Sequence, residues 1–180
     1  MENHQYKFGT FFWRIASSQI VTYMVMGVIA TNLLNYKEIF DSSDTLRAYD
    51  SPWIAAGPAL QVFRGLIFAL ALWYFKDNFL FQKHGWLKLW GLLIGLSILS
   101  TTAAASGSIE GFIYTTTPIP DQMKGYIEVV LQVGMFSFFV CYWYAHPKKL
   151  WNVLSIILVT LVIFMSFMGV LAANEIIATS

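Results

Sequence analysis

The sequence predicts an all-α, polytopic integral membrane protein, a bundle of five transmembrane helices, on three observations. Hydrophobic residues make up 57% of the 180 residues and charged residues only 12%, against about 45–50% and about 25% in soluble domains. The few charges lie between long apolar runs rather than inside them. Each run approaches the ~20 residues that a helix needs to cross a hydrocarbon core of ~30 Å.

Five apolar runs follow one another along the chain, and we expect residues 1–180 to form a single transmembrane domain. The first run carries Arg14 and lacks a small-residue cleavage site at the usual distance, so we interpret it as a spanning helix rather than a signal peptide. The predicted spans cover about 11–34, 52–75, 87–105, 125–145 and 150–173.

Charges in the connecting segments predict which end of each span faces the cytoplasm. The segments after the second and fourth spans are rich in lysine, whereas those after the first and third are acidic on balance. Lysine and arginine mark the cytoplasmic side of a membrane. We therefore expect a multi-pass protein of the plasma (inner) membrane, with its N-terminus in the cytoplasm and its C-terminus outside.

Aromatic residues gather near the ends of the predicted spans. Indole and phenol rings prefer the headgroup region of a bilayer, because one side of the ring is apolar and the other is polar. We therefore interpret these residues as interfacial anchors, namely Trp13, Trp53, Trp73, Tyr74, Trp86, Trp90, Trp143, Tyr144 and Trp151.

Several kinds of chemistry have no support in the sequence. A single cysteine, Cys141, excludes an intrachain disulfide and a thiol-rich metal site. All three histidines lie outside the predicted spans, which excludes a haem held between two intramembrane histidines. The net charge of +1 gives no indication of nucleic-acid binding. No catalytic or nucleotide-binding motif is present, so we expect no cofactor, no metal and no catalytic residue, and an enzyme is the less favoured class.

The second span carries an arginine deep within it. Arg64 lies roughly 18 Å along the helix from Pro52, close to the middle of the bilayer. Placing arginine there costs ~2.5–3.5 kcal/mol on insertion scales. Gln61 lies one turn nearer the outer surface on the same face. Because helical side chains lean toward the helix N-terminus, we expect the guanidinium to reach into the outer half of the membrane.

The fourth span offers partners for this arginine. Glu128 lies near its predicted start, and Gln132 lies one turn deeper on the same face. Tyr23 falls near mid-depth in the first span. We expect Gln61, Arg64, Glu128 and Gln132 to form a buried polar cluster between the second and fourth spans, in the outer leaflet and within reach of Tyr23.

Residues 106–122 are predicted to form an outer loop that lies against the membrane surface. This loop carries Glu110 in a glycine-flanked turn, Gly107 to Gly111, with Tyr114 close by. Glu110 is either a solvated acid, which is the preferred interpretation, or a lid residue that approaches Arg64 together with Tyr114.

Two interpretations account for the predicted cluster. In the first it is a structural network that fixes how the helices pack; in the second it lines a pocket in which Arg64 pairs with a small anionic or lipid-like ligand. The second makes the protein a ligand-binding or transport protein. One alternative is a non-catalytic accessory or assembly subunit that packs against another membrane protein or further copies of this chain. Another is a membrane-embedded enzyme that uses Glu128 or Glu110 as a general acid or base.

A permanently open channel is disfavoured by the pattern along the second and fourth spans. Their predicted cytoplasmic halves carry almost no polar side chains. A hydrated pore needs a polar lining.

Overall fold

The structure, a computed structural model, describes residues 7–41, 46–99 and 108–179. In these ranges the chain forms α-helices and one π-helical turn but no strand, so the predicted all-α class is confirmed. Four helices are long and apolar enough to cross a membrane, as expected of a polytopic membrane protein. They are α1 (Phe8–Leu33), α3 (Pro52–Trp73), α7 (Ile119–Ala145) and α8 (Lys149–Thr179), whose apolar part is Lys149–Asn174.

Short helices lie between the long ones. The predicted third span, 87–105, begins as α5 and continues without a break as the π-helical turn η1, while residues 100–105 lie outside the described ranges. The short elements are α2 (Tyr36–Asp41), α4 (Lys76–Phe79), α5 (Gly85–Ile94), η1 (Gly95–Leu99) and α6 (Ile109–Tyr114).

The fourth predicted span begins earlier than the sequence suggested. Helix α7 starts at Ile119 rather than near residue 125, and part of the predicted outer loop is the short helix α6. Pro120 is compatible with this start, because the N–H groups in the first turn of a helix have no intrahelical acceptor and the N–H that proline lacks is not needed there. Glu128 and Gln132 therefore lie deeper along α7 than predicted.

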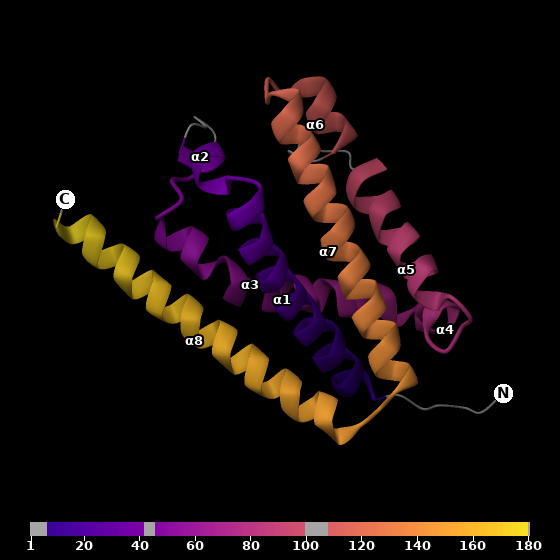
Figure 1. Cartoon of the computed structure of the whole chain (residues 1–180). Helices are drawn as coiled ribbons and strands as arrows, with labels where there is room; N and C mark the ends of the chain where they lie inside the picture. The colour runs from indigo at the N-terminus through magenta and orange to yellow at the C-terminus, as the bar shows by residue number, and fades with distance from the viewer. Residues whose placement is uncertain (1–6, 42–45, 100–107, 180) are drawn as a thin grey trace.

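Helix α1 lies at the centre of the bundle and packs against α3, α7 and α8, while α5 packs against α7 (Figure 1). Helices α3 and α8 also pack against each other. We call the end where α1 leads into α2 and where α3 and α7 begin the α2 end. The opposite end, where α1 and α8 begin, is the α4 end (Figure 1). The charge pattern predicts that the α4 end faces the cytoplasm.

The α1–α3 pair is antiparallel and is held by small and polar residues on one face of each helix. Gly57, Gln61 and Gly65 follow at four-residue spacing on α3, so they share a face. This face meets Ala16, Gln19 and Tyr23 of α1 in the opposite chain direction. Small residues permit close helix approach in membranes, and paired amides hold two helices together.

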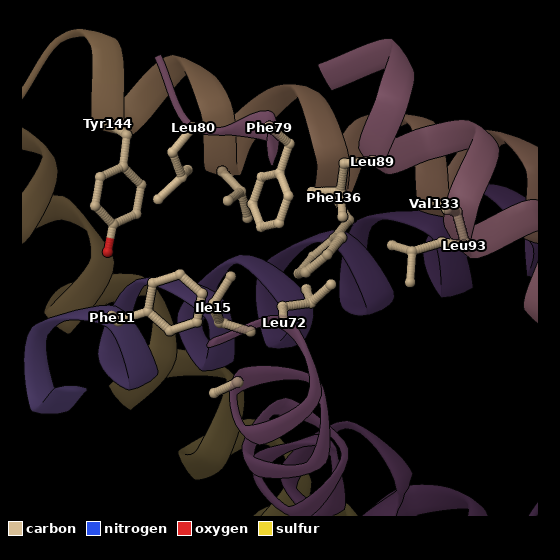
Figure 2. Close-up of a cluster of buried hydrophobic side chains, with 12 residues drawn as sticks. Phe11, Ile15, Leu72, Phe79, Leu80, Leu89, Leu93, Val133, Phe136 and Tyr144 are labelled. Carbon is tan, nitrogen blue, oxygen red and sulfur yellow. The ribbon is translucent and has the colours of Figure 1, made fainter. Parts of the chain in front are cut away.

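Apolar side chains fill the α4 half of the bundle (Figure 2). They come from five helices and form one continuous core. This core lies between the polar groups nearer the α2 end and the α4 end of the bundle. The core includes Phe11, Ile15, Leu72, Phe79, Leu89, Phe136 and Tyr144.

Trp90 joins α5 to α7 through a hydrogen bond. Its indole Nε1 donates to the carbonyl oxygen of Val130 at 3.0 Å. The ring lies over Gly134, where a β-carbon would stand 3.3 Å from Nε1. Trp90 thus holds two helices together, a contact that the predicted role of interfacial anchor did not include.

Candidate functional site: a polar cavity at the α2 end

A polar cavity of about 800 Å³ opens at the α2 end of the bundle. Its walls come from the second half of α1, from α2, from the first turns of α3, and from the start of α7 with the segment before it. The polar and charged side chains of the wall are Tyr23, Thr31, Asn32, Tyr36, Tyr49, Thr116, Thr117, Asp121, Gln122 and Glu128.

Glu128 is held in this cavity by Tyr36, whose hydroxyl donates a hydrogen bond to the carboxylate oxygen Oε2. Tyr36 begins α2, directly after Asn35. Asn35 has a φ of 52°, a left-handed conformation that asparagine adopts more readily than most residues. This turn folds α2 back from the end of α1 and brings Tyr36 against α7.

The hydroxyl of Tyr36 resists ionisation. Burial raises the pKa of Tyr36 above the ordinary value of tyrosine, and the hydrogen bond to Glu128 and the charge of Glu128 raise it further. The phenol therefore stays neutral and acts as a donor to the carboxylate at neutral pH.

Two further aromatic rings, those of Phe40 and Tyr49, continue the cavity wall from Tyr36. The ring centroids of Tyr36 and Phe40 lie 5.9 Å apart, and those of Phe40 and Tyr49 lie 6.3 Å apart. Tyr49 is fixed on both sides: its backbone N–H donates to Asp41, and its hydroxyl lies 3.3 Å from the hydroxyl of Thr31. The rings of Tyr36, Phe40 and Tyr49 and the carboxylate of Glu128 thus form one continuous part of the cavity wall.

Pro58 adds a backbone acceptor on the α3 side. It lies inside α3 and has no N–H to offer to the carbonyl of Ile54, one turn earlier. Both residues line the cavity. The carbonyl of Ile54 therefore lacks its usual helical donor next to the cavity.

Tyr23 and Glu128, two of the residues predicted to form a site, are both in the cavity wall. Tyr23 lies in the electrostatic field of Glu128 and of Arg64. The hydroxyl of Tyr23 points at α3, where a β-carbon on Gly57 would stand 3.5 Å from it.

The predicted arginine clamp is not formed, and this expectation was wrong. Arg64 is exposed and makes no hydrogen bond or ion pair with any residue in the described part of the chain. Its Cζ lies 5.4 Å from the ring centroid of Phe68, and Phe68 in turn contacts Phe136 of α7, with the ring centroids 5.6 Å apart. The side chains expected to bind Arg64 have partners elsewhere: Gln61 of α3 bonds to Gln19 of α1, and Glu128 of α7 bonds to Tyr36 of α2.

The other predicted members of the clamp have different partners or positions. Gln61 accepts a hydrogen bond from the side-chain amide of Gln19, at 3.0 Å, and Gln19 is only 2% exposed. Gln132 is buried on α7 and does not line the cavity. Neither amide reaches Arg64, so the second and fourth spans do not share the predicted polar cluster.

Glu110 and Tyr114 lie on α6, away from the cavity wall. Gln122 fixes α6 against the start of α7 by donating to the carbonyl of Gly111 at 3.3 Å and to Thr115 Oγ1 at 3.0 Å. Tyr114 is 72% exposed. The structure therefore does not bring these two residues to Arg64 or to the other predicted site residues.

Arg14 is a buried charged residue; from its sequence position near the cytoplasmic end of the first span we expect a lipid-phosphate or topological role. It is 8% exposed, and its guanidinium lies on the rings of Trp143 and Tyr144, with Cζ 5.4 and 4.4 Å from their centroids. The available signal was helical spacing: Ser17 and Ser18 follow one turn later, and a run of polar residues inside an apolar helix indicates a buried face.

The described residues contain no group of three or more His, Cys, Asp or Glu side chains that could hold a metal ion. The cavity wall offers hydrogen-bond acceptors instead, namely a carboxylate, tyrosine and threonine hydroxyls and a backbone carbonyl.

No protein-family model, curated protein or solved structure gives a significant match to this chain. The fold defines the class, an all-α polytopic membrane protein, and the cavity is its candidate site.

Proposed function

We propose that this protein binds a small cationic amphiphile, a molecule with an amine or quaternary ammonium group and an apolar tail, in the cavity at the α2 end. One observation carries the proposal: Glu128 shares the cavity wall with three tyrosines, and no lysine, arginine or histidine is among the described lining residues. The volume of about 800 Å³ lies within the range of ~300–1,000 Å³ that small-molecule sites occupy.

The wall supplies contacts suited to each part of such a ligand. The carboxylate of Glu128 pairs with the ammonium, and the faces of Tyr36, Phe40 and Tyr49 attract the same charge through their π electrons. The carbonyl of Ile54 is a further acceptor for an N–H group. The apolar tail packs on the remaining wall, which includes Met24, Val28, Ile39, Leu46 and Val129.

The sequence favoured an anionic ligand because Arg64 was expected to face the pocket. Arg64 is not among the described lining residues, and Lys124 pairs with the wall residue Asp121 at 2.9 Å. The charge balance of the wall therefore supports a cation. Passage of the ligand toward the α4 end would require the apolar core to open, so the proposal is binding, and transport would need a second conformation.

The test is thermal unfolding of the detergent-purified protein with decyltrimethylammonium or decylamine below their micellar concentrations. Decanol, which has the same tail without the charge, is the neutral comparison. We expect both cations to raise Tm by roughly 5 °C at saturation and decanol to have a much smaller effect.

Two matched variants complete the test. Glu128→Gln removes the carboxylate from the cavity, and we expect it to remove most of the ammonium-induced shift. Glu110→Gln makes the same change on α6, outside the cavity, and we expect the shift to remain. An unchanged response in Glu128→Gln, or an equal response to decanol, would exclude this site.

Arg64 favours a second function, that of a non-catalytic subunit of a larger membrane complex. Arg64 is exposed on a helix of spanning length. In a bilayer an arginine facing lipid at this depth would cost ~2.5–3.5 kcal/mol. A carboxylate on a spanning helix of a partner would remove this cost. Among the described spans of this chain Glu128 is the acid at comparable depth, and it lies in the cavity wall between the helices of its own bundle. A different protein is therefore a better partner than a second copy.

Purification in mild detergent tests this second function. We expect a stoichiometric partner that is lost in Arg64→Met and retained in Arg64→Lys, which keeps the charge. Arg47→Gln removes an exposed arginine at the α2 end and serves as the control. Recovery of the same species with wild-type and Arg64→Met protein would contradict a role for Arg64 in assembly.

A further inference from the structure

We infer that Arg14 and Trp143 form an oxyanion site at the α4 end, which binds the phosphate group of a membrane lipid. This site lies at the opposite end of the bundle from the cavity considered above and does not depend on its function. Arg14 comes from the second turn of α1 and Trp143 from the last turn of α7.

Arg14 is buried, and its guanidinium has no counter-ion among the described residues. The residue is 8% exposed, and no hydrogen bond or ion pair links it to any residue within 7–41, 46–99 or 108–179. Its Nε atom is buried and has no acceptor. The contacts that it does make are with the ring faces of Trp143 and Tyr144.

Aromatic ring faces do not replace the hydrogen bonds to water that a guanidinium loses when it is buried. A guanidinium carries five N–H donors, and aromatic faces attract the charge but accept these hydrogen bonds poorly. Buried charges in proteins are paired with an opposite charge and hydrogen-bonded. An oxyanion supplies both the negative charge and the acceptor atoms, and guanidinium binds phosphate oxygens in pairs.

Trp143 presents a second donor of the same kind. Its indole Nε1 is also buried and without an acceptor, and the residue is 6% exposed. Indole is a donor only. Two side chains in contact thus each carry a buried N–H donor with no acceptor among the described residues, which indicates that one further acceptor group binds both.

An apolar cavity next to Trp143 indicates that the oxyanion belongs to an amphiphile. The cavity has a volume of about 200 Å³ and lies between α1, α7 and α8. Trp143 forms part of its wall, together with Ser17 and Ser18, one turn after Arg14, and the apolar Leu154 and Leu158 of α8. A free phosphate has no use for such a cavity, whereas an acyl chain fits it.

Arg14 lies at a depth at which it can reach a lipid headgroup. It lies roughly 9 Å along α1 from Phe8, near the end of the helix where phosphate groups of a bilayer would lie. The loops at this end carry the lysines that predict a cytoplasmic location, where anionic lipids are abundant.

The experiment measures Tm of the delipidated, detergent-purified full chain with three probes. They are dioctanoyl-phosphatidylglycerol, dioctanoylglycerol, which lacks the phosphate, and inorganic phosphate. We expect the phospholipid to raise Tm by roughly 5 °C near saturation, and the other two probes to have little effect. An equal shift with inorganic phosphate would assign the site to free phosphate, and an equal shift with dioctanoylglycerol would reduce it to an acyl-chain contact; each overturns the lipid-phosphate site.

Substitutions test whether the phospholipid-induced shift in Tm depends on Arg14. We expect Arg14→Gln to raise the phospholipid concentration for the half-maximal shift on the order of tenfold or more. Arg47→Gln is the matched control, because Arg47 also stacks on a tryptophan, Trp53, with Cζ 5.1 Å from the ring centroid, but is exposed at the α2 end. An Arg14→Gln protein that responds like wild type overturns the proposal.

A second variant covers the case in which Arg14→Gln does not fold. Trp143→Phe keeps an aromatic face under the guanidinium and a wall for the cavity, and removes only the N–H donor. We expect it to fold and to need several-fold more phospholipid for the same shift. A wild-type response in Trp143→Phe would remove the indole from the site and overturn the proposal as stated.

Discussion

Gly65 of α3 and Ala16 of α1 lie in direct backbone contact: a β-carbon on Gly65 would stand 2.6 Å from Cα of Ala16. The atom in the way belongs to the backbone, so the two helices would have to move apart to admit it. The same close approach allows Gln19 and Gln61 to form their hydrogen bond. The contact between a glycine and an alanine thus sets the distance at which a buried amide pair can bond.

Gly65→Ala is therefore expected to destabilise the protein. Overpacking of a close contact costs about 1–3 kcal/mol, which lowers Tm by several degrees in thermal unfolding. Gly91→Ala is the control, because a β-carbon on Gly91 meets nothing within 4 Å. That variant should gain up to about 1 kcal/mol from helix propensity. Equal Tm changes in the two variants would contradict the close packing of α1 on α3.

The Gln19–Gln61 pair is expected to behave as a coupled unit. Gln19→Leu or Gln61→Leu alone leaves a buried amide without its partner, which costs about 1–3 kcal/mol. The double variant replaces both partners with apolar groups and should cost less than the sum of the single variants. A double-mutant cycle of unfolding free energies measures the coupling; strict additivity would show that the hydrogen bond contributes nothing.

Tyr36 is expected to ionise at a higher pH than exposed tyrosines. Burial, the largest cause, and the bond to Glu128 both raise its pKa above the usual 10.0. The stability that the neutral phenol contributes is therefore complete below about pH 10 and is lost as pH rises through the raised pKa. Difference absorbance at 295 nm between wild type and Tyr36→Phe follows the ionisation of this phenol.

Glu128→Gln separates the causes of this pKa shift. The variant removes the carboxylate charge but leaves the phenol buried, so the pKa of Tyr36 should fall and still exceed 10. An unchanged pKa in Glu128→Gln would show that the two side chains do not interact.

The hydrogen bond of Trp90 is expected to stabilise the packing of α5 on α7. Trp90→Phe keeps a ring over Gly134 and loses the donor to the carbonyl of Val130, at a cost of about 1 kcal/mol from the bond and more from the smaller ring. Trp53→Phe, at a site where the side chain is 61% exposed, should change Tm much less. Similar losses in both variants would indicate that Trp90 acts only as an interfacial ring.

The positions of the long helices were predictable, because hydrophobic runs of spanning length depend on local composition alone. Helices α1 and α3 begin and end within a few residues of the predicted spans. The start of α7 was placed too late, because Pro118 and Pro120 suggested a loop, although a proline in the first turn is compatible with a helix.

The site was predictable only in part. Glu128 and Tyr23 stood out as polar residues inside apolar runs, and both line the cavity. Tyr36 did not stand out, because it lies in a polar connecting segment, 92 residues before Glu128 in the chain. Its role depends on the left-handed turn at Asn35, which a single asparagine in a loop does not specify.

The sequence by itself determined that this is an all-α membrane protein, and it identified which buried polar residues needed partners. The reason is that the cost of placing a polar group in a membrane follows from the residue type and its depth along a helix. Only the tertiary structure decided which partners they have. Helix α1 packs against both α3 and α7. Gln61 pairs with Gln19 of α1, Glu128 pairs with Tyr36 of α2, and Arg64 is exposed. Helix adjacency depends on backbone contacts such as Gly65 on Ala16, which the spacing of polar residues along each helix does not reveal.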